Sequence, residues 1–296
     1  MIYGMTEGLD RWWIHFSYFD GWWAWGFFLF WAFLFGGCMG SFLNVCVWRI
    51  PRGESIVDQP SHCPVCGALI RWYDNVPFFA YLNLRGRCRN CKTHIPIRYL
   101  LMEAVVGLLF AALLAKAGWS EQSPAVLLMY FPMASLAFTT FLIDARHRII
   151  PDLTTYPAMA AGVLFSALVP AAWGMQHWYW SGLYSLGSLA ATGIFLGAFA
   201  WIGGRIAGRD VLGWGDVKFM MACGALLGIP GALFTLFTGS LMGTVYGAVL
   251  WNRRRKKGRR RRLSIPFGPF LAVGSVLWML IGEKCLKLYL QLLMVQ

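Results

Sequence analysis

Long apolar stretches are the feature that most constrains how this chain can fold. Most are about as long as a helix needs to cross a bilayer, about 20 residues. They cover residues 22–48, 99–116, 124–143, 154–173, 182–203, 217–230, 231–251 and 266–291. Hydrophobic residues make up 58% of the 296 residues and charged residues only 13%, which excludes a secreted disulfide scaffold, a disordered protein and a conventional cytosolic enzyme. The sequence predicts an all-α polytopic membrane protein with about eight transmembrane helices.

Lysine and arginine are distributed unevenly along the chain. The 26 basic residues outnumber the 13 acidic residues and give a formal net charge of +13. If the N-terminus lies outside the cell, alternate loops fall in the cytoplasm, and these loops contain 22 of the 26 basic residues. They are residues 49–98, 144–153, 204–218 and 252–263. Because cytoplasmic loops carry an excess of Lys and Arg, the sequence predicts this orientation.

The largest polar segment, residues 49–98, contains two C-x-x-C pairs. Cys63 and Cys66 form the first pair, Cys88 and Cys91 form the second, and 21 residues separate them. Two such pairs can supply four thiolates to one tetrahedral zinc ion, and four cysteines leave no open position for catalysis. We therefore predict a small zinc-ribbon-like cytoplasmic insert with a structural zinc ion. Two redox-active or unliganded cysteine pairs are the alternative.

Two of the few acidic residues stand at the cytoplasmic ends of predicted spans. Asp144 follows the third apolar stretch and Asp216 precedes the sixth. If helix packing brings them together, one ionised carboxylate can take a proton from water while its protonated partner donates to a carbonyl oxygen, as in aspartyl proteases. The alternative is structural, as a helix N-cap or as ordinary ion pairs with Arg146 or Lys218.

Several motifs together resemble those of the prepilin peptidases, the GxGD-type intramembrane aspartyl proteases of type IV pilus and type II secretion systems. A single G-x-G-D motif is a weak signal, but the motifs occur in family order over most of the chain. They are Gly40-Ser-Phe-Leu-Asn44-Val with Arg49-Ile-Pro51, the two cysteine pairs with Asn75-Val-Pro77 and Arg85-Gly86, Arg98-Tyr99 leading to Glu103, Ile143-Asp144 with Pro151-Asp152, and Gly213-Trp-Gly215-Asp216-Val-Lys218.

This resemblance implies an activity and the residues that perform it. Asp144 and Asp216 are then the catalytic pair of a peptidase that cleaves the basic leader from pilin or pseudopilin precursors at the cytoplasmic face of the bacterial inner membrane. Asp152 is the competing candidate, and Asp144 is preferred because it precedes the Pro-Asp pair. The four-Cys loop is associated with bifunctional members, so the resemblance also implies N-methylation with S-adenosylmethionine. No glycine-rich Rossmann pattern for this cofactor is present.

Three further residues are candidates for binding the substrate or the methyl donor. Glu103 lies inside the second apolar stretch, where a carboxylate is costly unless it is paired or faces a polar cavity. It could bind the new α-ammonium group or the methyl donor, or it could pair with Arg98. Asn44 could hydrogen-bond the substrate backbone or bridge two helices. Lys218 could influence Asp216 or extend its ammonium group to the membrane interface.

Residues 253–262 are nearly all Arg or Lys. Such a cluster can bind anionic lipid headgroups, which is the preferred interpretation, and enforcement of topology is the alternative. We expect no nucleic-acid binding, because no aromatic residues are interleaved with the run. Since the leader of the implied substrate is also basic, we expect the run to lie away from the cleavage site.

The predicted organisation has three parts. Residues 1–48 form a periplasmic N-terminus and the first transmembrane helix, residues 49–98 form the cytoplasmic four-Cys loop, and residues 99–296 form a transmembrane aspartyl protease core with the basic loop 252–263. Two alternatives stay open. One is a relative that cleaves but does not methylate, and the other is a non-enzymatic membrane scaffold in which the two aspartates lie far apart.

Overall fold

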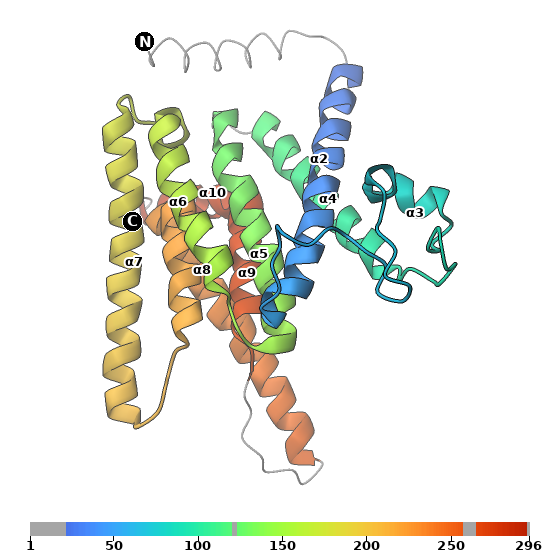
Figure 1. Ribbon diagram of the computed structural model, residues 1–296. Helices are drawn as coiled ribbons and strands as arrows, with labels where there is room; N and C mark the ends of the chain where they lie inside the picture. The colour runs from blue at the N-terminus through green and yellow to red at the C-terminus, as the bar shows by residue number, and fades with distance from the viewer. Residues whose placement is uncertain (1–21, 120–122, 257–264, 295–296) are drawn as a thin grey trace. The chain divides into compact units, whose positions relative to one another are not determined.

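The computed structural model describes residues 22–119, 123–256 and 265–294 (Figure 1). Within these ranges the regular structure is helical apart from two isolated β-bridges, in agreement with the predicted all-α class. The chain divides into two compact units, Met1–Pro124 and Ala125–Gln296. Most of the basic run 253–262 lies outside the described residues, so its contact with lipid headgroups stays a prediction.

Unit 1 is built on two long helices that cross closely. A Cβ atom on Gly36 would lie 2.8 Å from the Cα atom of Gly107, and one on Gly40 would lie 2.9 Å from the Cα atom of Glu103. Because glycines let helix backbones approach within the membrane, these positions fix how the two helices pack. The elements of unit 1 are α2 (Trp22–Arg49), η1 (Ile50–Arg52), η2 (Trp72–Asn75), α3 (Phe79–Asn83) and α4 (Arg98–Trp119).

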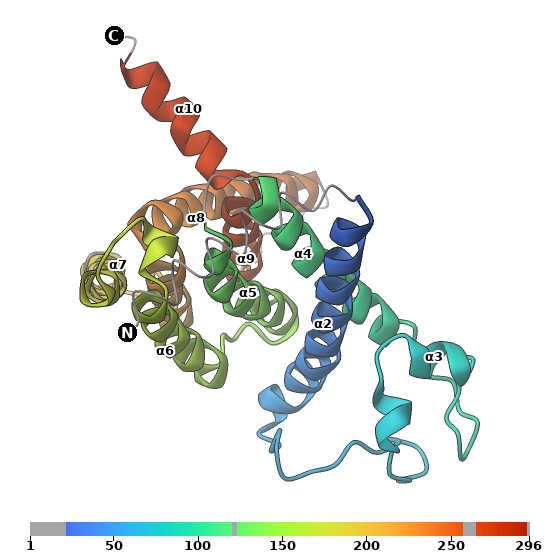
Figure 2. The same ribbon diagram turned by 90° about the horizontal axis from the view of Figure 1, so that it is seen from above.

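Unit 2 is a bundle of helices whose core lies among α5, α8 and α9. Met133, Phe219 and Leu271 are completely or almost completely buried there. Figure 2 shows α7 at the edge of the unit, where its exposed Ile194 and Phe195 suit a surface in contact with lipid. The elements of unit 2 are α5 (Leu127–His147), α6 (Asp152–Leu168), η4 (Pro170–Trp173), α7 (Trp178–Ala207), α8 (Trp214–Lys256), α9 (Gly268–Leu277), η5 (Trp278–Gly282) and α10 (Glu283–Met294).

Six helices in the described ranges are long and apolar enough to cross a membrane, so the predicted count of about eight is not confirmed. The expected span 154–173 corresponds to α6, which has only 17 residues. The expected spans 217–230 and 231–251 join in α8, which is interrupted at Gly228 (φ 70°, ψ 178°). In Figure 1 the two halves of α8 run in different directions. The six helices occupy Trp25–Arg52, Arg98–Gly118, Pro124–His147, Trp178–Ala207, Trp214–Arg253 and Gly268–Leu293.

Candidate active site and metal centre

Asp144 lies in the last turn of α5 and is only 6% exposed. Arg148 ends the helix by adopting a left-handed conformation (φ 58°, ψ 40°), and its N–H donates to the Asp144 carbonyl oxygen at 3.0 Å. The carboxylate oxygen Oδ2 of Asp144 accepts a hydrogen bond from the backbone N–H of Gly268, at 2.9 Å. This carboxylate is therefore held by a residue that is far away in the sequence.

Asp216 is the third residue of α8 and is partly buried. The backbone of Gly213, just before the helix, provides a hydrogen bond to its carboxylate. A carboxylate three positions after the cap that reaches back to the cap backbone is one half of a capping box. The structural role that the position of Asp216 suggested is thus present. This capping role does not exclude a second role, because the Asp216 carboxylate also interacts electrostatically with another carboxylate.

The second acid is Asp144, which interacts electrostatically with Asp216. The two residues come from α5 and α8 and belong to the same compact unit. Each carboxylate also lies against a glycine. A Cβ atom would lie 3.1 Å from Asp216 Oδ2 if placed on Gly213, and 2.8 Å from Asp144 Oδ2 if placed on Gly268. Two carboxylates that interact electrostatically favour different protonation states, which is what acid–base catalysis by an aspartate pair requires.

Asp152 forms an ion pair instead of joining the two aspartates. The Lys218 ammonium nitrogen lies 2.6 and 2.8 Å from its two carboxylate oxygens, and it also lies 5.3 Å from the centre of the Tyr156 ring. The Asp152 side chain is about half exposed, at 53%. Asp152 and Lys218 therefore link the start of α6 to the start of α8. The suggested influence of Lys218 on Asp216 stays a prediction.

Glu103 faces the cysteine loop within unit 1. Its Oε2 atom accepts the backbone N–H of Phe78 at 2.9 Å, and Ser41 adds a side-chain hydrogen bond. Arg98, the alternative partner, lies over the rings of Trp48 and Tyr99. These hydrogen bonds offset the free-energy cost of placing the Glu103 carboxylate in an apolar helix. Binding of substrate or methyl donor by Glu103 is a prediction that these contacts do not test.

Phe78 is held in a strained conformation by the same contact. Its φ of 63° is positive, and the Phe79 N–H donates to the Pro77 carbonyl oxygen across it, which defines a tight γ-turn. The Phe78 ring stacks on Phe33 with centroids 4.8 Å apart and fills the space beside Gly37. Strained backbone persists only where surrounding contacts hold it. Phe78 therefore docks the loop onto α2. Asn44, also on α2, is buried, and its proposed contact with substrate stays a prediction.

The four cysteines of the loop converge. Their sulfur atoms all lie within 4.8 Å of one another, and those of Cys63 and Cys91 are 3.8 Å apart. Four thiolates bound tetrahedrally at about 2.3 Å from zinc would be about 3.8 Å apart. Matching turns present the two pairs, because Gly67 N–H donates to Cys63 O at 2.9 Å and Lys92 N–H donates to Cys88 O at 3.1 Å. The donor set fits one zinc ion.

The pKa values of Cys88 and Cys91 in this cluster are shifted in opposite directions. Hydrogen bonds from the backbone of Cys91 and Asn90 lower the pKa of the Cys88 thiol to about 6. For Cys91, a backbone hydrogen bond from Thr93 acts in the lowering direction, but desolvation and the hydrogen bonds with the other thiols raise its pKa to about 11. A divalent cation would offset the repulsion among four thiolates. The electrostatics therefore also fit a metal centre.

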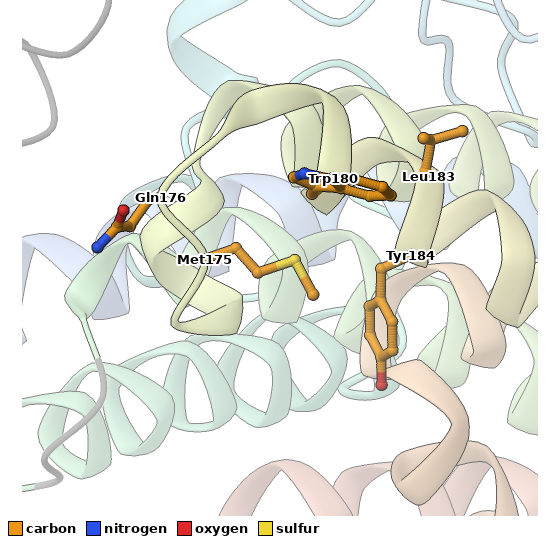
Figure 3. Close-up of a pocket in the computed structure, with 5 residues that line it drawn as sticks. All are labelled: Met175, Gln176, Trp180, Leu183 and Tyr184. Carbon is orange, nitrogen blue, oxygen red and sulfur yellow. The ribbon is translucent and has the colours of Figure 1, made fainter.

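A cavity of about 620 Å³ lies within unit 2. It is lined by residues around the start of α7 (Figure 3). This is the far end of α6 from the Asp152–Lys218 ion pair, because α6 begins at Asp152 and ends before η4. The lining residues include no carboxylate, histidine, lysine or cysteine. They are Met175, Gln176, Trp180, Leu183 and Tyr184.

Two residues of these sites were missed by reasoning from the sequence. Gly268 stands in Pro266-Phe-Gly268-Pro269, a cluster that marks a helix start. Nothing in that cluster points to Asp144. Phe78 follows the Asn75-Val-Pro77 motif, and its insertion beside Gly37 has no counterpart in the sequence pattern. Both contacts depend on long-range packing.

Comparison with known proteins assigns most of the chain. Residues 34–117 match the bacterial peptidase A24 N-terminal domain, and residues 131–248 match the type IV leader peptidase family. A prepilin leader peptidase/N-methyltransferase of Xanthomonas campestris pv. campestris is 31% identical over 86% of this chain and 92% of its own length. The one from Myxococcus xanthus is 34% identical over 77% of this chain and 64% of its own length.

A relative named as a type 4 prepilin-like proteins leader peptide-processing enzyme, from Escherichia coli O78:H11, is 32% identical over 81% of this chain and 89% of its own length. No solved structure matches the chain. The segment matched to the type IV leader peptidase family contains Asp144 and Asp216, and the segment matched to the N-terminal domain contains all four cysteines of the cluster.

Proposed function

Because the chain belongs to the type IV leader peptidase family, we propose that it removes the basic leader from prepilin-like precursors and then N-methylates the new N-terminus. Its apolar helices and its bacterial relatives make it a multi-pass inner-membrane protein. The excess of Lys and Arg in alternate loops supports an active site on the cytoplasmic side. Pilins and pseudopilins are the substrate class.

The pairing of the buried Asp144 with the partly buried Asp216 is the observation that carries the peptidase proposal. One ionised carboxylate of Asp144 and Asp216 removes a proton from the attacking water, and the protonated partner donates its proton to the scissile carbonyl oxygen. The resulting tetrahedral intermediate collapses when the amide nitrogen receives a proton and the C–N bond breaks. The electrostatic effect of Asp144 on Asp216 supports this shared role.

The cysteine loop has a structural role in this proposal. Cys63, Cys66, Cys88 and Cys91 would hold Zn²⁺ and fix the two knuckle turns to each other, and no position of the ion would be left for substrate. The loop in turn carries Phe78, which reaches Glu103 on α4. Metal binding therefore stabilises the fold of a loop that is too small to bury a core of its own.

The contacts of the described residues assign no side chain to the binding of the methyl donor. The carboxylate of Glu103, the best candidate to bind an ammonium group, is already hydrogen-bonded by Phe78 and Ser41. The proposed methylation therefore rests on the relatives alone. We also propose that the basic run 253–262 binds anionic lipid headgroups, because their charges are opposite.

Cleavage of a prepilin-like precursor in membranes tests the peptidase. Asp144→Ala and Asp216→Ala should each abolish the release of the leader, measured by the mass of the product. Asp152→Ala is the matched control, because it removes a carboxylate of the same segment that is paired with Lys218, and it should retain cleavage. Cleavage by either of the first two variants would refute the assignment.

Mass analysis of the mature N-terminus, with and without S-adenosylmethionine, tests methylation. A bifunctional enzyme adds one methyl group only when the donor is present. An unmodified product in both samples identifies a relative that only cleaves. A scaffold without enzymatic activity leaves the precursor intact in every sample.

A further inference from the structure

Asp144 lies where a negative charge is unfavourable. The C-terminal end of a helix carries a partial negative charge from its unpaired carbonyl groups, and Asp144 stands in the last turn of α5. The side chain is also removed from water. Arg148 attracts the carboxylate electrostatically, but its own side chain is exposed and therefore screened. The carboxylate needs another source of stabilisation if it is to take part in catalysis.

The N-terminus of α9 provides that source. Gly268 is the first residue of this helix, and its N–H donates to Asp144 Oδ2 at 2.9 Å in a buried hydrogen bond. The neighbouring donors are already used or missing. The N–H groups of Phe270 and Leu271 bond to the carbonyl oxygen of Phe267, and Pro269 has none. The Gly268 N–H is thus the orphan donor of this helix start, and Asp144 accepts it.

Only glycine fits between α9 and the carboxylate. A Cβ atom at position 268 would lie 2.8 Å from Oδ2 of Asp144, 3.0 Å from its Cγ atom and 3.1 Å from its Cβ atom. Any side chain would therefore push the carboxylate away from its present position. Position 268 also lies beyond residues 131–248, the segment matched to the type IV leader peptidase family.

We propose that Gly268 is a positioning residue of the catalytic aspartate pair. Its N–H occupies Oδ2 of Asp144 and holds the carboxylate at the end of α5, so that the other oxygen, Oδ1, is the atom that exchanges protons during the reaction. The positive end of α9 makes the charge of Asp144 tenable at this place. This inference rests on the proposed peptidase function.

Kinetics of Gly268→Ala test the proposal with the full-length enzyme and a prepilin-like precursor. A misplaced catalytic group costs turnover rather than binding, so we expect kcat to fall by about a hundredfold and KM to change by less than about twofold. Gly243→Ala is the matched control. Its Cβ would touch Phe267 and Phe270 at 3.6–3.7 Å, an ordinary contact with the same segment. The control should leave both constants and the unfolding temperature unchanged.

A second variant separates the N–H group from the added side chain. Gly268→Pro also removes the donor, and proline is tolerated at the first position of a helix. It should lower kcat further than Gly268→Ala does. Gly268→Ala with an unchanged kcat would overturn the proposal. So would a parallel loss of kcat, substrate affinity and thermal stability, which is the pattern of a purely structural glycine.

Amide exchange keeps the test decisive if the variants at position 268 fail to fold. In glycine-labelled protein, the Gly268 amide proton should exchange at least about tenfold faster in Asp144→Ala than in the unmodified protein, because its acceptor is gone. Equal exchange rates would overturn the proposal. Failure of the proposed function has a different signature, since the unmodified enzyme itself would then leave the precursor uncut.

Discussion

Replacing Glu103 by alanine should undock the cysteine loop from α2 and α4. The substitution removes the acceptor of the Phe78 N–H. A hydrogen bond to a charged group contributes about 1.5–3 kcal/mol, and undocking would also release the strain stored at Phe78, about 1–3 kcal/mol. Because about 1.4 kcal/mol corresponds to a tenfold change, loss of the bond alone should raise the undocked population by about tenfold to a hundredfold.

Hydrogen–deuterium exchange of the peptide that contains Phe78 measures this population. Glu103→Gln is the matched control, because its amide keeps an oxygen that can accept the Phe78 N–H, and its effect should be much smaller. Unchanged exchange in Glu103→Ala would refute the docking role. A Glu103→Gln variant that loses methylation while the loop stays docked would instead support a direct role of Glu103 in binding the substrate or the methyl donor.

Two further predictions concern the metal centre and the break in α8. Cys88→Ser should lower the zinc content of the purified protein, measured by atomic emission, from about one ion per chain to near zero, because three thiolates bind the ion less tightly than four; Cys38→Ser, outside the cluster, should not change the zinc content. Gly228→Ala should lower the unfolding temperature, because the φ of 70° is strained for alanine and its Cβ would lie 2.8 Å from both Trp173 and Tyr184. An unchanged zinc content, or an unchanged melting transition, would contradict the respective argument.

The break in α8 at Gly228 could not be predicted from the hydropathy of the sequence. Apolar residues continue on both sides of Gly228, so the sequence shows that this segment belongs in the membrane. Whether two helices meet there in one continuous element depends on the backbone angles of one glycine, which can adopt many conformations. The end of α6 at Leu168 is different, because Val169 precedes Pro170, and a proline disfavours helical backbone at the residue before it.

For the candidate sites too, some residues could be predicted from the sequence and others could not. The two aspartates and the four cysteines could be named from the sequence, because rare charged residues at span ends and paired cysteines are local signals. The partners of these residues could not be named. Asp152 pairs with Lys218, and Glu103 with the backbone of Phe78, across 66 and 25 positions of the chain. Such pairs are set by how helices pack.

The sequence by itself showed that this protein belongs in a membrane, and it named the candidate metal ligands and the family, since hydropathy, cysteine spacing and short motifs are written in neighbouring residues. Only the tertiary structure decided which backbone group meets which carboxylate. The Gly268 N–H reaches Asp144 across 124 positions because α9 packs against α5. A backbone N–H group is the same in every residue except proline, so no sequence pattern marks the one that completes the site.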